Sequence, residues 1–357
     1  MGAILAPAVF DRLHKGGVIP AHPLALKEDL SIDEERQRRL TRYYISCGVH
    51  GIAIGVHTTQ FEIRKPEFNY FKRVLEITAD EIRRANVAPS FIKVAGICGP
   101  IDQAIEEAET AKKLGFDLGL LSMGGLDSLS ERQLIERAKA VAEVIPVFGF
   151  YLQPAVGGRI LTYSFWEEFC SIDHVFAIKV APFNRYYTLD VVRAVSLSGR
   201  SDEIALYTGN DDNIVLDLIT PYIVKSGSRL IEKWFVGGLL GHYAVWTKKS
   251  VDLFNYLKDG LANGNLDYNE ALKLAVKVTD MNAALFDSAN NFKGSIAGIH
   301  EVLRRQGLLE GIWCLNPEER LSPNQAADLD RVTAQYKELI DDEYVKEFIL
   351  EDNGSKR

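Results

Sequence analysis

The sequence predicts a (β/α)8 barrel followed by a C-terminal helical extension. Short apolar runs alternate with longer amphipathic segments through most of the chain. There are eight such runs, and eight is the number of parallel strands that closes a barrel. An open, doubly wound sheet that binds a dinucleotide would carry a glycine-rich loop after its first strand, and the sequence has none there. We therefore expect the barrel.

The expected strands are uniformly apolar and short, which is typical of strands buried on both faces. They lie near residues 17–26, 51–59, 91–98, 117–123, 146–153, 175–181, 204–209 and 233–238. Helical patterns separate them, for example at 31–48, 100–115 and 129–144. Helix starts are expected at Ser31, Asp102 and Ser130, and helix ends at Gly48 and Gly115.

The strand pattern stops near residue 258, and the rest of the chain is helical in pattern. A length of 357 residues would fit two average domains, but barrels of this class often reach about 250 residues as one domain. We therefore expect a barrel over 1–258, including a short N-terminal segment, and a helical extension over 259–357.

Charge and composition exclude several classes of function. The net charge of -8 argues against a nucleic-acid-binding protein and against binding to an anionic membrane surface. No stretch approaches the roughly 18 consecutive apolar residues of a membrane-spanning helix. The four cysteines are widely spaced, form no CxxC pair and are expected to be reduced, mostly buried thiols of a cytoplasmic protein.

The strand over 175–181 contains one charged residue, Lys179, among apolar neighbours. By alternation, Ala177 and Lys179 share one face, and the bulkier Phe176 and Ile178 share the other, so we expect the small set to point into the barrel. Lys179 would then lie near the C-terminal end of its strand, where barrel enzymes place their chemistry. A desolvated amine has a lowered pKa and can attack a ketone to form a Schiff base. The alternative is a structural lysine that is paired inside or reaches the rim.

Two neighbouring motifs fit the same chemistry. Tyr151 ends the preceding strand, and its phenol could exchange protons with a Schiff-base intermediate. Thr58 and Thr59 follow the second strand, and their hydroxyl and amide groups could bind a carboxylate or relay a proton. A solvated rim tyrosine and a helix cap are the structural alternatives.

Other polar residues follow the expected strands. Asn184 and Arg185 come just after Lys179, and Asn210 follows the seventh strand, so all three are candidates for contact with a polar substrate. Helix capping is the alternative explanation for Asn210. His22 and His57 end the first two strands, but no HxxxH spacing supports a metal site, and we expect none.

Together these motifs resemble the dihydrodipicolinate synthase and N-acetylneuraminate lyase superfamily. The resemblance rests on "GVHTTQF" before "FYLQP" and "AIKVAPF", and on the glycine motifs "ALYTGNDD" and "FVGGLLG". It covers most of the barrel, and the family also has a C-terminal helical extension.

The resemblance implies a class I aldolase mechanism without a separate cofactor. Lys179 would form an imine with pyruvate or another 2-oxo acid, and Tyr151 would shuttle protons. Thr58 and Thr59 would hold the substrate carboxylate, with Thr58 relaying protons to Tyr151. The family also implies a homo-oligomer, which we expect to be a tetramer. The expected substrate-binding residues are Thr58, Thr59, His57, Asn184, Arg185 and Asn210.

The chain departs from the synthase pattern at several positions. His57, Gln60 and Phe61 flank the threonines where the family motif has Gly before them and Gly-Glu after them. The fourth strand ends in Met123 where synthases have a tyrosine, and Val156 stands where they have an arginine, with Arg159 three residues later. We therefore expect a lyase, aldolase or dehydratase for another 2-oxo acid.

Two alternatives remain open. One is an authentic 4-hydroxy-tetrahydrodipicolinate synthase, in which Arg159 or Arg185 supplies the missing charge. The other, from a different class, is a non-catalytic barrel that binds a 2-oxo acid.

Overall fold

The computed structural model describes residues 4–354, and eight parallel strands of this range form one sheet. Their order is β1-β10-β7-β6-β5-β4-β3-β2, and a parallel bridge between Ala21 and Ala53 links the segments of the first and last strands. The predicted barrel is therefore confirmed. The strands are β1 (Val18–Pro20), β2 (Gly51–Ile54), β3 (Ile92–Ile97), β4 (Leu118–Leu121), β5 (Val147–Leu152), β6 (Val175–Ala181), β7 (Ala205–Thr208) and β10 (Phe235–Leu240).

Helices separate these strands and continue after the last of them. They are α1 (Pro7–Lys15), α2 (Glu34–Ser46), α3 (Phe71–Arg84), α4 (Ile101–Lys113), α5 (Glu131–Ala142), α6 (Tyr163–Cys170), α7 (Arg185–Leu197), α8 (Ile214–Ile219), α9 (Thr247–Ala262), α10 (Tyr268–Leu285), α11 (Ser295–Arg305), α12 (Gln325–Gln335) and α13 (Asp342–Gly354). No helix in the described range is both long enough and apolar enough to cross a membrane.

Capping residues and glycines in the sequence correctly predicted some of the helix ends but not all of them. Ser130 caps α5, because its hydroxyl accepts a hydrogen bond from Gln133 N, and Gly48 and Gly115 take the positive φ that ends a helix. Ser31 does not begin α2, whose cap is Asp33. Asp102 likewise lies in the first turn of α4 instead of capping it.

The chain packs as two compact units. The first combines the segment up to Gly17 with Pro89–Leu239, and the second combines Val18–Ala88 with the segment from Leu240 onward. The predicted boundary at residue 258 falls inside α9, and this boundary stays a prediction.

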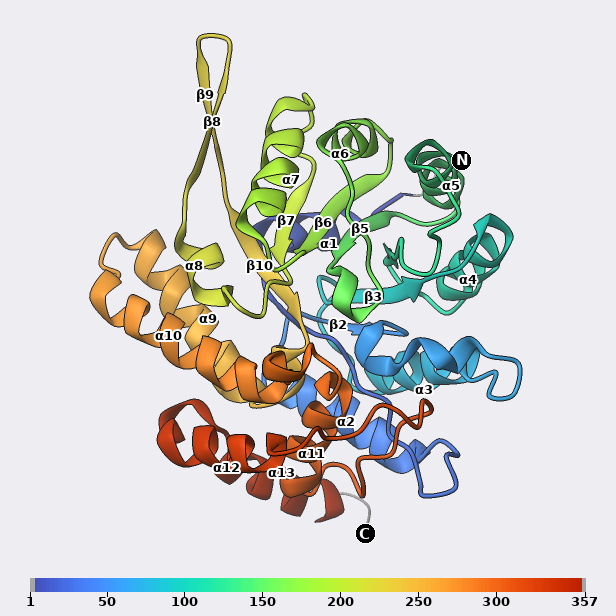
Figure 1. Cartoon of the computed structure of the whole chain (residues 1–357), viewed down its shortest axis with the longest axis vertical. Helices are drawn as coiled ribbons and strands as arrows, with labels where there is room; N and C mark the ends of the chain where they lie inside the picture. The colour runs from blue at the N-terminus through green and yellow to red at the C-terminus, as the bar shows by residue number, and fades with distance from the viewer. Residues whose placement is uncertain (1–3, 355–357) are drawn as a thin grey trace. The chain divides into compact units, whose positions relative to one another are not determined.

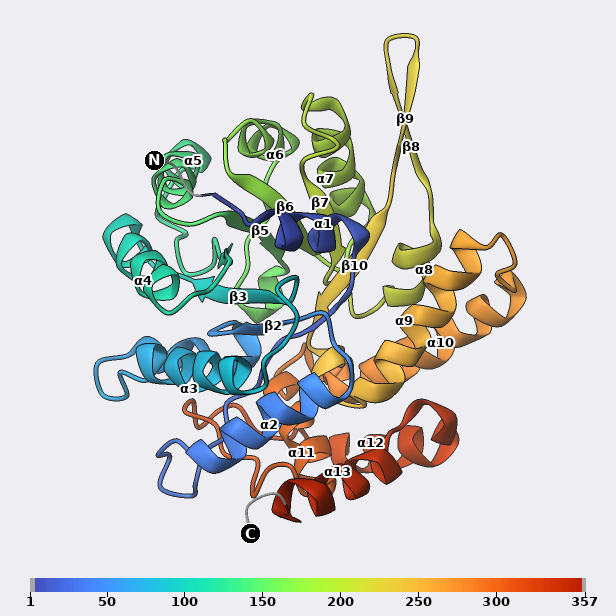
Figure 2. The same cartoon turned by 180° about the vertical axis from the view of Figure 1, so that it is seen from behind.

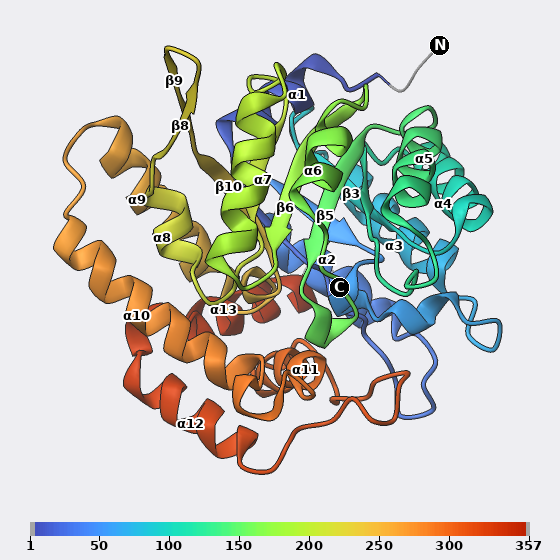
Figure 3. The ribbon, with the colours of Figure 1, turned by 45° about the horizontal axis from the view of Figure 1, so that its top comes forward.

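In the first unit, β3 to β7 lie side by side with their connecting helices (Figure 1). The same unit carries an antiparallel hairpin, β8 (Tyr222–Ser226) and β9 (Arg229–Lys233), which was not predicted. The hairpin lies beside α7 and extends beyond it (Figures 1 and 3).

In the second unit, α2 lies against the C-terminal helices (Figure 2). Asp341, just before α13, holds several of them together. Its carboxylate accepts hydrogen bonds from Tyr43 Oη at 2.5 Å, from Lys248 N at 3.0 Å and from Gln306 Nε2 at 2.9 Å. One buried side chain thus joins α2, the start of α9 and the end of α11.

Candidate functional site

Lys179 lies on the inner face of β6 with an aromatic residue on each side. Its register partners are Phe150 on β5 and Tyr207 on β7, and paired residues of parallel strands share one face. The opposite face of β5 meets the helices, because a Cβ at Gly149 would lie 2.6 Å from the ring of Phe169 in α6. Lys179 is therefore directed into the barrel, as predicted from strand alternation.

The immediate surroundings of Lys179 are tight and apolar. The side chain is only 7% exposed, and its Nζ lies 4.4 Å from the centre of the Phe150 ring. On the other side is Gly209, just after β7, where a Cβ would come within 2.6 Å of Lys179 Cε. The strand end after β7 therefore needs glycine at this point so that the lysine chain can pass.

This environment changes the acidity of the amine. Burial lowers the pKa of Lys179 to about 8, and the negative charge of Asp211 opposes that shift. With that pKa, about a tenth of the amine is neutral at pH 7, compared with well under a thousandth for an ordinary lysine. The lysine is thus suited to attack a carbonyl carbon.

Tyr151 does not share the face of Lys179. Its ring lies on the helix side of β5, 5.1 Å from the ring of Trp166 in α6 and 6.1 Å from that of Tyr187 in α7. Its hydroxyl lies 3.3 Å from both Leu161 N and Leu161 O, and burial raises its pKa to about 12. The residue beside Lys179 on β5 is Phe150, which has no proton to transfer.

Thr58 and Thr59, in the second unit, form a short turn over His57–Thr59 after β2. The Thr59 hydroxyl donates to His22 O at 2.7 Å and accepts from Gly55 N at 2.9 Å. The Thr58 hydroxyl donates to Ala21 O at 2.7 Å. Both hydroxyls therefore tie this turn to the segment after β1, and their role toward a substrate stays a prediction.

His57 and His22 differ in exposure and in partners. The His57 ring is partly exposed and lies 5.7 Å from that of Phe61. His22 is fully buried, with Nε2 3.0 Å from Thr41 Oγ1, and burial lowers its pKa to about 4. Within residues 4–354, no group of three His, Cys, Asp or Glu side chains could hold a metal ion.

Two of the three polar residues expected after β6 and β7, Arg185 and Asn210, converge on a carboxylate that the sequence did not single out. Asp217 is fully buried and accepts hydrogen bonds from Arg185 Nη1 at 2.5 Å and from Asn210 Nδ2 at 3.0 Å. Asn184 caps α7 by accepting from Tyr186 N. These residues hold the two loops in place, and their side chains are already engaged. Arg159 is engaged as well, since it donates to the carbonyls of two residues in the loop after β4.

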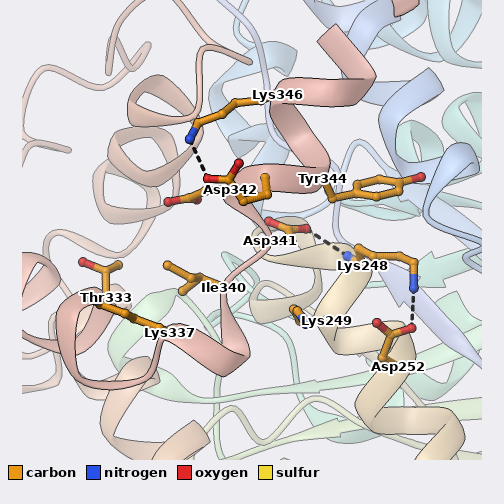
Figure 4. Close-up of a pocket in the computed structure, with 11 residues that line it drawn as sticks. Lys248, Lys249, Asp252, Thr333, Lys337, Ile340, Asp341, Asp342, Tyr344 and Lys346 are labelled. Carbon is orange, nitrogen blue, oxygen red and sulfur yellow. Dashed lines mark hydrogen bonds and ion pairs between the residues drawn. The ribbon is translucent and has the colours of Figure 1, made fainter. Parts of the chain in front are cut away.

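A separate pocket of about 610 Å³ lies in the second unit (Figure 4). It is lined by Lys248, Lys249, Asp252, Thr333, Lys337, Ile340, Asp341, Asp342, Glu343, Tyr344 and Lys346. None of the predicted site residues belongs to it. Its charges are partly matched within the pocket, for example between Lys346 and Glu343 at 2.7 Å.

No family model matches the chain. The chain is 23% identical over 331 residues to N-acetylneuraminate lyase 2 of Escherichia coli, covering 91% of this chain and 95% of that protein. It is 22% identical over 268 residues to 4-hydroxy-tetrahydrodipicolinate synthase of Clostridium novyi, covering 74% of this chain and 79% of that protein.

The solved structures that are similar to the chain are of the same kinds of protein as these sequence relatives. The chain superposes with a TM-score of 0.72 and 19% identity on dihydrodipicolinate synthase from Oceanobacillus iheyensis, covering 92% of this chain and 99% of that one. The same TM-score and identity relate it to YagE of E. coli, solved with pyruvate, over 90% of this chain and 98% of that one. The relatives and solved structures to which the chain is similar are consistently dihydrodipicolinate synthases, N-acetylneuraminate lyases and members of the same superfamily, and the solved structures share the fold of the chain.

Proposed function

We propose that the protein is a Schiff-base-forming lyase or aldolase, or a dehydratase, that acts on pyruvate or another 2-oxo acid through Lys179. The observation that carries this proposal is the buried amine on the inner face of β6, with a pKa of about 8. The family supports it, because its relatives include a lyase and a synthase, and one solved neighbour holds pyruvate.

The proposed chemistry begins with the neutral amine. Its lone pair attacks the keto carbon, the oxygen leaves as water, and a protonated imine remains on Lys179. The imine draws electrons from the adjacent carbon, so that a carbon–carbon bond can form or break there, or water can be eliminated. Hydrolysis then frees the lysine, and no other cofactor is needed.

The roles of the other motif residues are proposed from the family resemblance. Tyr151 would transfer protons, and Thr58 and Thr59 would bind the substrate carboxylate, with Thr58 relaying protons to Tyr151. His57, which stands where the family motif has glycine, is proposed as a substrate contact from its place beside the threonines. The face that Tyr151 takes in the structure does not support a direct exchange with Lys179. Asp211 is the charged group whose field reaches Lys179, and it would stabilise the protonated imine.

Borohydride trapping tests the imine. With pyruvate and borohydride we expect an irreversible adduct on Lys179, located by peptide mass spectrometry, and none in Lys179→Ala. Lys233 is a matched internal control, because burial also lowers its pKa to about 8, but its ammonium donates to the carbonyls of Ser201 and Ile204. An adduct on Lys233, or none with any 2-oxo acid, would contradict the assignment.

The pH dependence of trapping follows from the lowered pKa. Only the neutral amine attacks, so the initial rate should rise tenfold per pH unit below about pH 8 and level off above it. An ordinary lysine would instead keep gaining rate up to about pH 10. A rate that is flat from pH 6 to pH 9 would show that the amine is not the titrating nucleophile.

We further propose that the substrate is not aspartate semialdehyde plus pyruvate. Met123 cannot relay a proton, and Val156 cannot pair with a carboxylate. A coupled assay for dihydrodipicolinate tests this proposal. Efficient product formation would instead favour an authentic 4-hydroxy-tetrahydrodipicolinate synthase. If trapping succeeds but no 2-oxo acid is turned over, the non-catalytic binding barrel is the better description.

A further inference from the structure

The β8–β9 hairpin is attached to the first unit by one of its two faces. Tyr222 and Lys233 pair across the strands and lie on this face, and Val224 and Ile231, the next pair on it, are half-buried. The Tyr222 ring lies 5.7 Å from the ring of Phe235, and the Lys233 ammonium donates to two backbone carbonyls. The second face of the hairpin therefore points away from the unit.

The second face is exposed and carries two apolar and two charged side chains. In one row Ile223 pairs with Glu232, and in the next row Lys225 pairs with Leu230. Ile223 is 54% exposed and Leu230 is 71% exposed. Glu232 accepts a hydrogen bond from Trp234 Nε1 at 2.6 Å. No ion pair in the part of the chain that the structure describes includes Lys225 or Glu232, so both charges are available to a second molecule.

The hairpin has little support of its own. Two antiparallel strands alone are at best marginally stable in water, because they bury too little surface. The turn at Gly227 and Ser228 extends beyond α7, so the first unit supports mainly the base of the hairpin (Figures 1 and 3). A surface that covers the exposed face would stabilise it.

The four exposed side chains make this face complementary to itself. Ile223 and Leu230 lie on one diagonal of the two rows, and the opposite charges of Lys225 and Glu232 lie on the other. Neighbouring strands are about 5 Å apart, and alternate residues of one strand are about 7 Å apart, so the four positions form a rough square. Two such faces can stack with their strands crossing at nearly a right angle.

In that arrangement a two-fold axis runs along the apolar diagonal. Ile223 then meets Ile223 of the second copy, and Leu230 likewise meets its own counterpart. Each Lys225 comes to lie opposite the Glu232 of the other copy, so both charges are matched twice. A closed two-fold contact requires this kind of self-complementary surface, whereas a different protein would not.

We propose that the β8–β9 hairpin is a self-association element that packs against the hairpin of a second copy of this chain. Four side chains cover less than the roughly 800 Å² per partner of a standard interface. The contact therefore strengthens a larger assembly, such as the homotetramer expected from the family resemblance, and does not hold a dimer by itself. This role is separate from the chemistry at Lys179.

Charge reversal tests the contact. Lys225→Glu and Glu232→Lys each place like charges opposite one another. Each should raise the concentration at which the assembly half-dissociates, measured by analytical ultracentrifugation, roughly tenfold. The double variant Lys225→Glu/Glu232→Lys restores opposite charges across the axis and should restore wild-type assembly. Arg229→Glu, exposed on the other face of the same hairpin, is the matched control and should leave assembly unchanged.

Cysteine cross-linking tests the symmetry. Ile223 lies on the proposed axis, so Ile223→Cys faces its own counterpart across about 10 Å, the usual separation of packed sheets. A bismaleimide reagent of about that span should join two chains into a covalent dimer. Ser226→Cys, exposed on the opposite face, should not be joined in this way, and wild-type protein controls for the native cysteines.

Three outcomes would overturn the inference, provided that circular dichroism shows each variant to be folded. The first is the absence of a cross-link in Ile223→Cys. The second is a double charge variant that assembles as weakly as the single ones. The third is a wild-type protein that stays monomeric at every concentration, which would leave the exposed face to a different partner or to none.

Discussion

At the scale of single residues, the chemistry depends on how closely Lys179 is enclosed. The aromatic ring of Phe150 and the backbone at Gly209 leave little room for water around Nζ. An amine in such surroundings loses hydration in its charged form, which is why its pKa falls while a salt-bridged lysine would keep a high one. The enclosure therefore keeps part of the amine neutral and able to attack a carbonyl. Small changes around Lys179 should alter the rate of imine formation.

Gly209→Ala tests that enclosure. The new methyl group would lie 2.6 Å from Lys179 Cε and 2.7 Å from Ala181 Cβ, so the lysine chain must move. We expect a folded protein with a greatly reduced rate of borohydride trapping. Gly119→Ala is a matched control in β4, where the methyl would meet Ile97 at 2.9 Å, far from the lysine in sequence and strand order. It should lower the thermal midpoint and leave trapping of the folded protein intact.

Tyr151→Phe tests the role of the phenol. In the structure its hydroxyl reaches only Leu161, so the substitution should destabilise the fold by about 1 kcal/mol, the usual contribution of one hydrogen bond. As the proposed proton shuttle, Tyr151 should matter for turnover, so steady-state turnover should fall far more than the rate of borohydride trapping. Turnover near wild type would contradict that role and would leave Tyr151 a structural residue that contacts Leu161.

The sequence identified Lys179 as a candidate residue but did not show which face of β5 carries Tyr151. A charged residue in an apolar strand is visible in one sequence, and alternation within β6 gave its direction. The relation between β5 and β6 includes a register shift between Val147 and Phe148, which no local pattern signals. Phe150 therefore faces Lys179, and Tyr151 faces the helices.

At the scale of elements, all eight barrel strands were predicted, because each is a short apolar run between turn signals. The β8–β9 hairpin was missed, although Gly227-Ser228 is a two-residue turn of the type that joins hairpin strands. Its strands hold no more than three apolar residues in a row, and none of their residues is buried, so they lack the longer buried apolar run of the barrel strands. A continuous apolar run marks strands that are buried on both faces, and this antiparallel hairpin is exposed.

Asp341→Ala tests how the C-terminal helices are attached. Removing the carboxylate leaves the buried Tyr43 hydroxyl and the N–H of Lys248 without this acceptor, and each such loss costs about 1–3 kcal/mol. Figure 4 shows the Lys248 side of this contact. We expect a marked fall in the urea midpoint. Asp342→Ala should have a smaller effect, since it removes one bond from Gln306, which still has Asp341 as an acceptor. Equal effects would show that Asp341 contributes only an ordinary surface contact.

At the scale of the whole molecule, the fold is shared with solved structures that are only 19% identical to the chain. Glycine positions and buried strands maintain the barrel, and these tolerate extensive substitution as long as the apolar pattern is kept. Specificity depends on a few polar contacts at the strand ends, which can change one at a time. The resemblance to this superfamily therefore supports the proposed imine chemistry more firmly than it supports any one substrate.

The oligomeric state is the last prediction, and its structural support lies on α10. Tyr268, Leu272 and Val276 recur every fourth residue on one face of this helix and are 55%, 51% and 69% exposed. An apolar stripe of this kind is typical of a helix that packs against another surface. With the family resemblance, we expect a homotetramer by light scattering at micromolar concentration, and a monomer would contradict it.

Val276→Glu should shift the mass to a smaller species, because an unpaired carboxylate is costly to bury. Leu350→Glu, at an apolar position 73% exposed on α13, is the matched control and should leave the tetramer intact. A tetramer that survives Val276→Glu would exclude α10 from the interface.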